Sequence, residues 1–246
     1  MRAMQTPFQS KLADRELNKR NEVVTILPEC STAEVLRLLG CSNGKRVSSR
    51  IKNKMRFWKN ELNKLIRPRI LYSVKNVANV SKTGVHLMDG ISFRSHKLSR
   101  AFSHCHEALL FTATIGPGFD ETVKDLAAKN RMSEACILDS LGSVAVENMV
   151  QQFHARYDAH LNLRGKSATL PFSPGYCDWN ISEQKKIFSL MDAERIGVSI
   201  NESALMEPRK SISGVVGLQN SVTSSGKPYN PCMHCTKVDC SYKRAV

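Results

Sequence analysis

The chain has 246 residues, of which 41% are hydrophobic and 24% charged, an ordinary composition for a soluble globular protein. This length can bury a full core, as one domain or one and a half. No apolar run reaches the roughly eighteen residues that a transmembrane helix needs. Its first residues also lack the apolar stretch of a secretory signal. We therefore expect a cytoplasmic protein without membrane contact, whose cysteines are mostly thiols or ligands.

The positive charge is concentrated at the N-terminal end. Residues 1–100 contain 21 Lys+Arg and 7 Asp+Glu, a surplus of +14 that equals the net charge of the whole chain. Such a surplus suits an acidic partner, which would be nucleic acid, an acidic electron-transfer protein or an acidic domain of another enzyme. A basic face that is only solvated explains it as well.

Two helices are predicted near the start of the chain. Residues 1–25 are a polar, charged lead-in, expected to be frayed or docked as a helix. Ser31–Glu34 has the pattern of a capping box and opens a short helix. Over residues 48–66, apolar residues recur at helical spacing, which predicts a long basic helix that ends before Pro68. The basic residues expected to face away from its apolar stripe are Lys52, Lys54, Arg56, Lys59 and Lys64.

The rest of the chain alternates β-prone and helical patterns. A continuous apolar run at 108–115 predicts a strand that is buried on both faces. Small residues between Ser133 and His160 predict a helix at the centre of the fold. The other expected elements are strands at 69–74, 85–88, 197–200 and 211–218, helices at 98–106, 119–129 and 181–194, and a loop at 170–179. Together they predict an α+β fold, with a mixed or antiparallel twisted sheet packed by a long central helix.

Three cysteines lie close together near the C-terminus, with the spacing C-x2-C-x4-C. They are Cys232, Cys235 and Cys240. Two thiolates separated by two residues can hold one soft ion, and a third can close over it. This spacing leaves three interpretations open: ligation of zinc or an iron–sulfur cluster, a thiol–disulfide role, or a reduced tail that binds no ligand. A fourth ligand would be Cys177, Cys41 or a substrate atom.

A family resemblance begins in the loop Phe172-Ser-Pro-Gly-Tyr-Cys-Asp-Trp179. Leu190–Val198, Asn201–Ser203 and Pro208–Gly214 follow it in an order and spacing that resemble the activation (reactivation) domain of cobalamin-dependent methionine synthase. Upstream, the sequence from Leu138 to Glu147 also resembles that family. The resemblance is greatest to the free-standing, single-domain members and covers roughly residues 30–244.

This resemblance implies a function in methyl transfer. Such domains bind S-adenosylmethionine (AdoMet) and present its methyl group to a corrinoid held by another domain or protein. There the cobalt is reduced by one electron and trapped by methylation. The protein would contribute positioning rather than a general base, so we name no catalytic residue and leave open whether it is an enzyme by itself.

The loop residues suit AdoMet on physical grounds. Gly175 lets the backbone pass close to a ligand. Tyr176 offers a ring face to the sulfonium, a cation–π contact of about 0.5–2 kcal/mol. Backbone groups of Ser173 and Pro174 can read adenine edges. Glu147 corresponds to a family position near the ligand.

Two residues depart from the family pattern. The family usually has an arginine five residues before the tyrosine, where it pairs with the AdoMet carboxylate, and Pro171 stands there instead. A guanidinium–carboxylate pair is a strong contact that proline cannot replace. Cys177 occupies a position where glycine is usual, beside the expected ligand, and it is a candidate fourth thiolate for the tail.

Three functions follow from these observations. The preferred one is an AdoMet-binding reactivation protein for a corrinoid methyltransferase, partnered by that corrinoid protein and by an acidic electron-transfer protein such as flavodoxin or ferredoxin. The second is a corrinoid-related redox protein with a cysteine-ligated iron–sulfur or zinc site and no AdoMet. The third and least favoured is a nucleic-acid-binding module. The expected segments are a basic extension (1–29), the AdoMet-binding domain (30–220), and a linker with the cysteine-rich tail (221–246).

Overall fold

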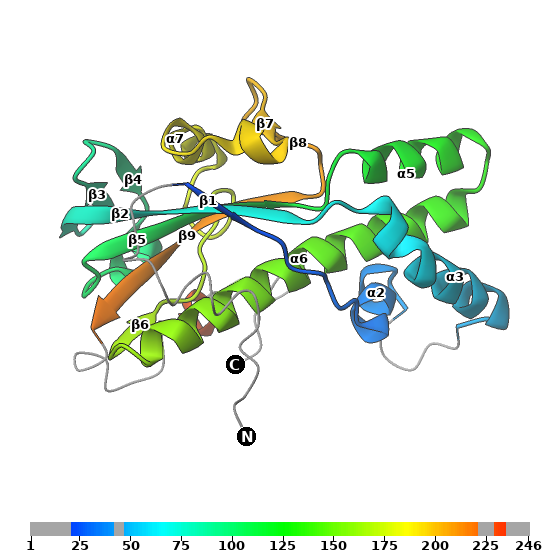
Figure 1. Ribbon diagram of the computed structural model, residues 1–246, viewed down its shortest axis with the longest axis horizontal. Coiled ribbons are helices and arrows are strands. Elements are labelled where there is room, and N and C mark those ends of the chain that lie inside the picture. The colour runs from blue at the N-terminus through cyan, green and yellow to red at the C-terminus, as the bar shows by residue number, and fades with distance from the viewer. Residues whose placement is uncertain (1–20, 42–46, 221–228, 235–246) are drawn as a thin grey trace.

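The protein is described by a computed structural model that covers residues 21–41, 47–220 and 229–234. It has an antiparallel seven-stranded sheet in the order β4-β3-β2-β5-β9-β6, with β1 paired to β2 (Figure 1). The predicted α+β fold is confirmed, and the sheet is antiparallel rather than mixed. Its strands are β1 (Glu22–Val24), β2 (Arg69–Ser81), β3 (Gly84–Leu87), β4 (Ser92–Arg94), β5 (Glu107–Thr114), β6 (Lys166–Ala168) and β9 (Ser211–Asn220). A separate two-stranded ribbon joins β7 (Ser199–Ile200) and β8 (Met206–Glu207).

Helices of very different length cover the sheet. The α-helices are α2 (Thr32–Leu38), α3 (Ser49–Leu65), α4 (His96–Ala101), α5 (Gly118–Ala128), α6 (Met132–Asn162) and α7 (Gln184–Ser189). Short 3-10 turns are η1 (Ile181–Glu183), η2 (Ala193–Ile196) and η4 (Pro231–His234). The first two α-helices start as the sequence predicts, because the hydroxyls of Ser31 and Ser48 accept from the backbone N–H of Glu34 and Ile51.

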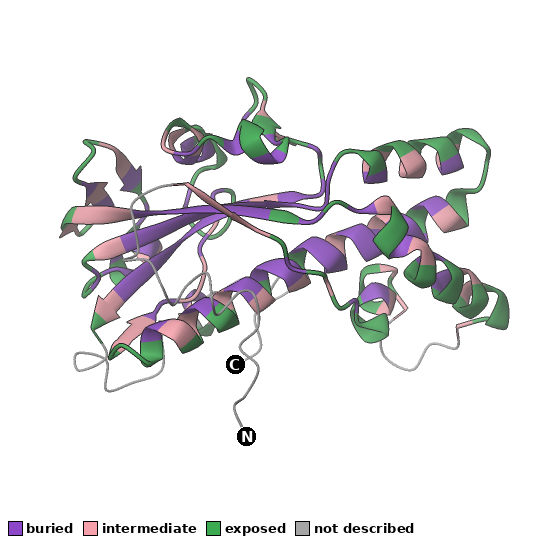
Figure 2. Ribbon diagram, viewed as in Figure 1, coloured by how far each residue is buried: buried purple, intermediate pink, exposed green. Residues whose placement is uncertain are grey.

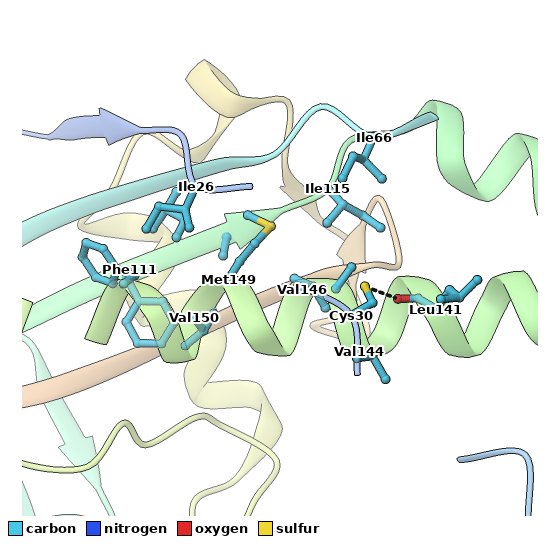
Figure 3. Packing of buried hydrophobic residues seen from close by; sticks show 14 of the residues in the cluster. Ile26, Cys30, Ile66, Phe111, Ile115, Leu141, Val144, Val146, Met149 and Val150 are labelled. Carbon is cyan, nitrogen blue, oxygen red and sulfur yellow. Dashed lines mark hydrogen bonds between the residues drawn. The ribbon is translucent and has the colours of Figure 1, made fainter. Parts of the chain in front are cut away.

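One face of the sheet is covered by α6, which has 31 residues and runs along the molecule (Figure 1). Its buried side meets the strands in one apolar cluster, where Met149 and Val150 lie beside Phe111 (Figure 3). In the burial view, α6 is purple toward the sheet and green or pink elsewhere (Figure 2). The prediction of a long central helix is therefore confirmed.

The opposite face is covered by short elements. The loop before η1, the helices α4 and α7 and the turn η2 together enclose a second cluster, which includes Leu110, Val215 and Trp179. Polar side chains are buried among them, for example Ser213, whose hydroxyl donates to Oε1 of Gln184 at 3.1 Å.

Three local expectations are wrong. Glu22–Val24 form a strand on β2 instead of a frayed or helical lead-in. The helix expected at 98–106 ends at Ala101, because the chain turns to bury Phe102 and Cys105. The helix expected at 181–194 is broken around Asp192, whose ψ of 72° is not helical. The break lets apolar residues on both sides of it reach the same core.

The described part of the N-terminal extension is integrated into the fold. The Tyr72 hydroxyl donates to the Glu22 carboxylate at 2.8 Å, and Ile26 and Cys30 are buried in the α6 cluster (Figure 3). Residues 22–30 therefore belong to the sheet and its core. Among the described residues, no helix is long and apolar enough to cross a membrane.

Candidate functional site at the edge of strand β9

The segment from Thr169 to Phe172 lies against β9 through backbone hydrogen bonds. Phe172 and Val215 exchange two N–H···O bonds of 2.9 and 2.8 Å. At the start of the segment, the N–H of Thr169 donates to the Gly217 carbonyl at 2.9 Å, and the Thr169 hydroxyl accepts from the Gly217 N–H at 2.9 Å. These bonds fix the backbone that leads into the Pro-Gly-Tyr turn.

Two glycines in β9 make room for this segment. A Cβ on Gly214 would lie 2.5 Å from the Phe172 carbonyl oxygen and 2.9 Å from the Ser173 hydroxyl. A Cβ on Gly217 would lie 2.5 Å from the Cys105 sulfur. Only residues without a side chain allow this close approach.

Asp178 fixes the far end of the loop. Its carboxylate accepts hydrogen bonds from Ser95 Oγ and the His96 N–H, both at 2.7 Å, and from the Lys97 N–H at 3.3 Å, at the start of α4. Burial raises the pKa of this carboxyl, but the hydrogen bonds outweigh burial and hold the pKa below its ordinary value. The loop is thus tied to α4 by a group that is ionised at neutral pH.

Trp179 anchors the same end in the second core. It is 3% exposed, and its ring meets that of Phe93 edge to face, with centroids 5.4 Å apart. Anchors therefore flank the turn on both sides, at Phe172 and at Trp179.

Between these anchors the chain makes a tight turn. Gly175 has a φ of 90°, in the left-handed region, and its N–H donates to the Trp179 carbonyl at 2.8 Å. The Tyr176 side chain is 45% exposed, so a ring of large area faces solvent on a fixed backbone. Cys177 also has a positive φ, 58°, which explains why glycine suits this position.

Alternation along the extended segment sets where its side chains point. Phe172 is buried in the second cluster, so its neighbours Pro171 and Ser173 face the opposite side, toward α6. The Ser173 hydroxyl agrees, because it lies on the same side of Gly214 as the ring of Phe111, a member of the α6 cluster.

Glu147 lies on the side of α6 that faces this edge. Four residues before it, Ser143 accepts a hydrogen bond from Lys210 Nζ at 2.9 Å, just ahead of β9. Seven residues after it, His154 Nε2 donates to the Thr169 carbonyl at 2.7 Å. Positions 143, 147 and 154 share one helix face, and Glu147 itself is exposed.

The structure therefore places the predicted ligand residues at one edge of the sheet. Ser173, Pro174, Gly175 and Tyr176 form the turn, and Glu147 faces that edge from α6. Pro174 is buried, so only its backbone is suited to a ligand. Lys166, the basic residue that begins β6, pairs with Glu107 at 3.1 Å.

Two of the predicted metal ligands, Cys235 and Cys240, lie outside the described residues, so the tail site remains a prediction. Cys232 is half-buried and Cys177 exposed, and no group of three potential ligands occurs within the ranges that the structure describes. Burial raises the pKa of Cys30 to about 11 and of Cys105 to about 12, so these two are protonated thiols.

These features define an α+β protein that holds a rigid aromatic turn at the edge of an antiparallel sheet, one face of which is covered by a long helix. Residues 104–225 match the family model described as vitamin B12 dependent methionine synthase, activation domain. Over this stretch the chain is similar to that family.

A solved structure agrees with this assignment at the level of the fold. It is described as the crystal structure of the MetH reactivation domain bound to AdoHcy. The two chains superpose with a TM-score of 0.64 at 14% sequence identity, and the match covers 85% of this chain and 81% of that one. Among curated proteins, none matches the chain significantly.

Sequence reasoning missed the residues that hold the loop in place. Asp178 stands within the motif that carries the family resemblance, and nothing in its sequence neighbourhood predicts a partner at Ser95. The signal for Gly214 and Gly217 was present, because glycines inside an apolar strand pattern mark a close backbone approach. His154 offers no such signal, since its partner is a carbonyl.

Proposed function

We propose that this protein binds AdoMet at the turn 173–176 and presents its methyl group to a corrinoid carried by a partner methyltransferase. The proposal is carried by the half-exposed Tyr176 ring on a turn that is anchored on both sides, within the stretch that matches the activation-domain family. A preorganised turn saves the entropy of ordering a loop when the ligand binds.

The residues at this edge fit the chemistry of AdoMet in three respects. The Tyr176 ring suits the sulfonium cation, whose charge is lost when the methyl leaves. The exposed carboxylate of Glu147 suits the ligand's ammonium or ribose hydroxyls. Backbone groups of the turn suit the adenine. The chain's own task is to bind and orient the methyl donor, and the corrinoid, when its carrier docks, supplies the nucleophilic cobalt.

One part of the ligand lacks its usual partner. The AdoMet carboxylate would meet Pro171, which has no charge. A charge-assisted hydrogen bond contributes about 1.5–3 kcal/mol, which corresponds to roughly ten- to a hundred-fold in affinity. We therefore expect weak AdoMet binding. The dissociation constant of the wild type should exceed that of a variant with the charge restored by this factor.

Calorimetric titration tests these statements. AdoMet should bind the wild type, Pro171→Arg should bind it roughly ten to a hundred times more tightly, and Tyr176→Ala should weaken it in either background. Phe57→Ala is the matched control, because Phe57 is 54% exposed on α3 and should leave the affinity unchanged. If neither the wild type nor Pro171→Arg binds AdoMet while both remain folded, the proposal is wrong.

The corrinoid carrier would dock partly through charge. On α3, Lys52 and Lys59 are exposed. Lys54 is half-buried and pairs with Glu134 at 3.3 Å, so, contrary to expectation, its charge is not free to contact a partner. Lys52→Glu should slow association with a corrinoid-loaded methionine synthase that lacks its own activation domain, because exposed charges act mainly on the association rate. Lys124→Glu, at an exposed position of α5, is the control. Equal rates for the two variants would contradict docking through α3.

A further inference from the structure

Three arginines line a cleft on the face of the sheet opposite α6. The cleft has a volume of about 380 Å³ and lies where the entry to β2, the turn after β5 and η2 meet. Arg67 precedes β2, Arg69 begins it, and Arg195 belongs to η2. These residues are distant from Tyr176 in sequence, and none of the loop 169–180 lines the cleft.

Backbone carbonyls hold each of the three guanidinium groups. Arg67 Nη1 donates to the carbonyls of Ile66 and Lys64 at 2.9 and 3.2 Å. Arg195 Nη1 donates to the Asn21 carbonyl at 2.9 Å, and Arg69 Nη1 approaches the Arg195 carbonyl at 3.5 Å. A guanidinium has five N–H donors, so every group keeps several for a ligand while its position is constrained.

These charges are not neutralised within the described part of the chain. None of the three forms an ion pair with a carboxylate there, whereas Arg37 pairs with Glu34 at 2.9 Å and Arg131 with Glu134 at 2.5 Å. Glu194 also lines the cleft, and it leaves a net charge of +2 on the charged lining residues Arg67, Arg69, Arg195 and Glu194. Like charges held together repel each other, so an anion between them is favoured.

The turn after β5 is shaped to keep Arg67 at the cleft. Gly116 has a φ of 92°, and a Cβ on it would lie 3.0 Å from the Cβ of Arg67. The N–H of Arg67 donates to the Ile115 carbonyl at 2.6 Å, which ties the two segments together. The cleft is thus part of the folded framework, between strands β2 and β5.

We propose that this cleft binds a phosphate group. Three guanidiniums can serve three phosphate oxygens, whereas a carboxylate offers two, and arginine is the side chain best suited to bidentate contact with phosphate. The cleft, with about 380 Å³, is many times larger than the roughly 30 Å³ that one water molecule takes in the liquid. It therefore has room for more than a single phosphate group. Both inorganic phosphate and the phosphate of a small ester therefore fit.

The test is titration of the whole chain with inorganic phosphate, 5′-AMP and adenosine at constant ionic strength. Phosphate and 5′-AMP should bind saturably, and Arg69→Gln and Arg195→Gln should each weaken them at least about ten-fold, as loss of a charge-assisted contact does. Arg50→Gln, an exposed arginine on α3, should leave both affinities unchanged. Tighter binding of 5′-AMP than of phosphate would indicate an ester as the ligand, and equal binding would indicate free phosphate.

Two results would overturn the proposal. One is absence of saturable phosphate binding at millimolar concentrations by folded wild type. The other is an equal loss of affinity in Arg50→Gln, which would indicate unspecific attraction to a basic protein. Melting curves of all variants establish that they fold, and AdoMet titration of Arg69→Gln keeps this site separate from the proposed methyl-donor site, which should be unaffected.

Discussion

The two faces of the sheet are built differently. One face carries a single helix of 31 residues, whose buried side is mainly apolar from Ala135 to Leu161. The other carries short elements with buried polar groups, among them Gln184 and Ser213. The Pro-Gly-Tyr turn is anchored in this second layer, and the arginine cleft lies within it. A long helix supplies the rigid base, and short segments tied by specific hydrogen bonds supply the surfaces for ligands.

The largest expected effect concerns the helical face. Phe153 is 1% exposed and packs its ring against Tyr72, Phe111 and Tyr157. Phe153→Ala should lower the free energy of unfolding by about 3–5 kcal/mol, because it removes apolar contacts and leaves a cavity. Chemical denaturation measures this, with the exposed Phe57→Ala as control. A loss below about 1 kcal/mol would mean that α6 is not the base of the fold.

An intermediate effect is expected where the loop meets β9. Gly214→Ala places a methyl group against the Phe172 carbonyl, which is backbone and must shift. We expect a loss of about 1–3 kcal/mol in stability together with weaker AdoMet binding. Gly217→Ala, which meets the Cys105 sulfur, should cost similar stability but leave the affinity less changed. If both variants bind AdoMet with the same affinity, the position of the loop does not control AdoMet binding.

The smallest expected effect concerns Asp178. Asp178→Asn should cost about 1 kcal/mol at neutral pH, as for the loss of other helix caps. Since the folded pKa lies below its ordinary value, the stabilisation is complete above about pH 5 and is lost as the pH falls through the folded pKa. The stability difference from wild type should therefore shrink in acid. Asp192→Asn, at an exposed position, is the control. A difference that stays constant with pH would contradict the role of the carboxylate.

How much could be predicted from the sequence differs between the two faces as well. The small residues between Ser133 and His160 and the apolar run at 108–115 were sufficient for α6 and β5, because both patterns extend over the length of a whole element. The helix expected at 181–194 failed because apolar spacing alone cannot show a break at Asp192. The turn 173–176 came from resemblance, while its anchor Asp178 depends on a partner 83 residues away at Ser95, which no local pattern records.

Hydrogen–deuterium exchange with and without AdoMet tests the central claim most directly, because it locates the ligand on the chain. The account predicts slower exchange in two segments only, the loop 172–179 and the turns of α6 around Glu147, and no change in α3. Protection that appears elsewhere, or none at saturating AdoMet, would contradict the placement of the methyl donor at the edge of β9.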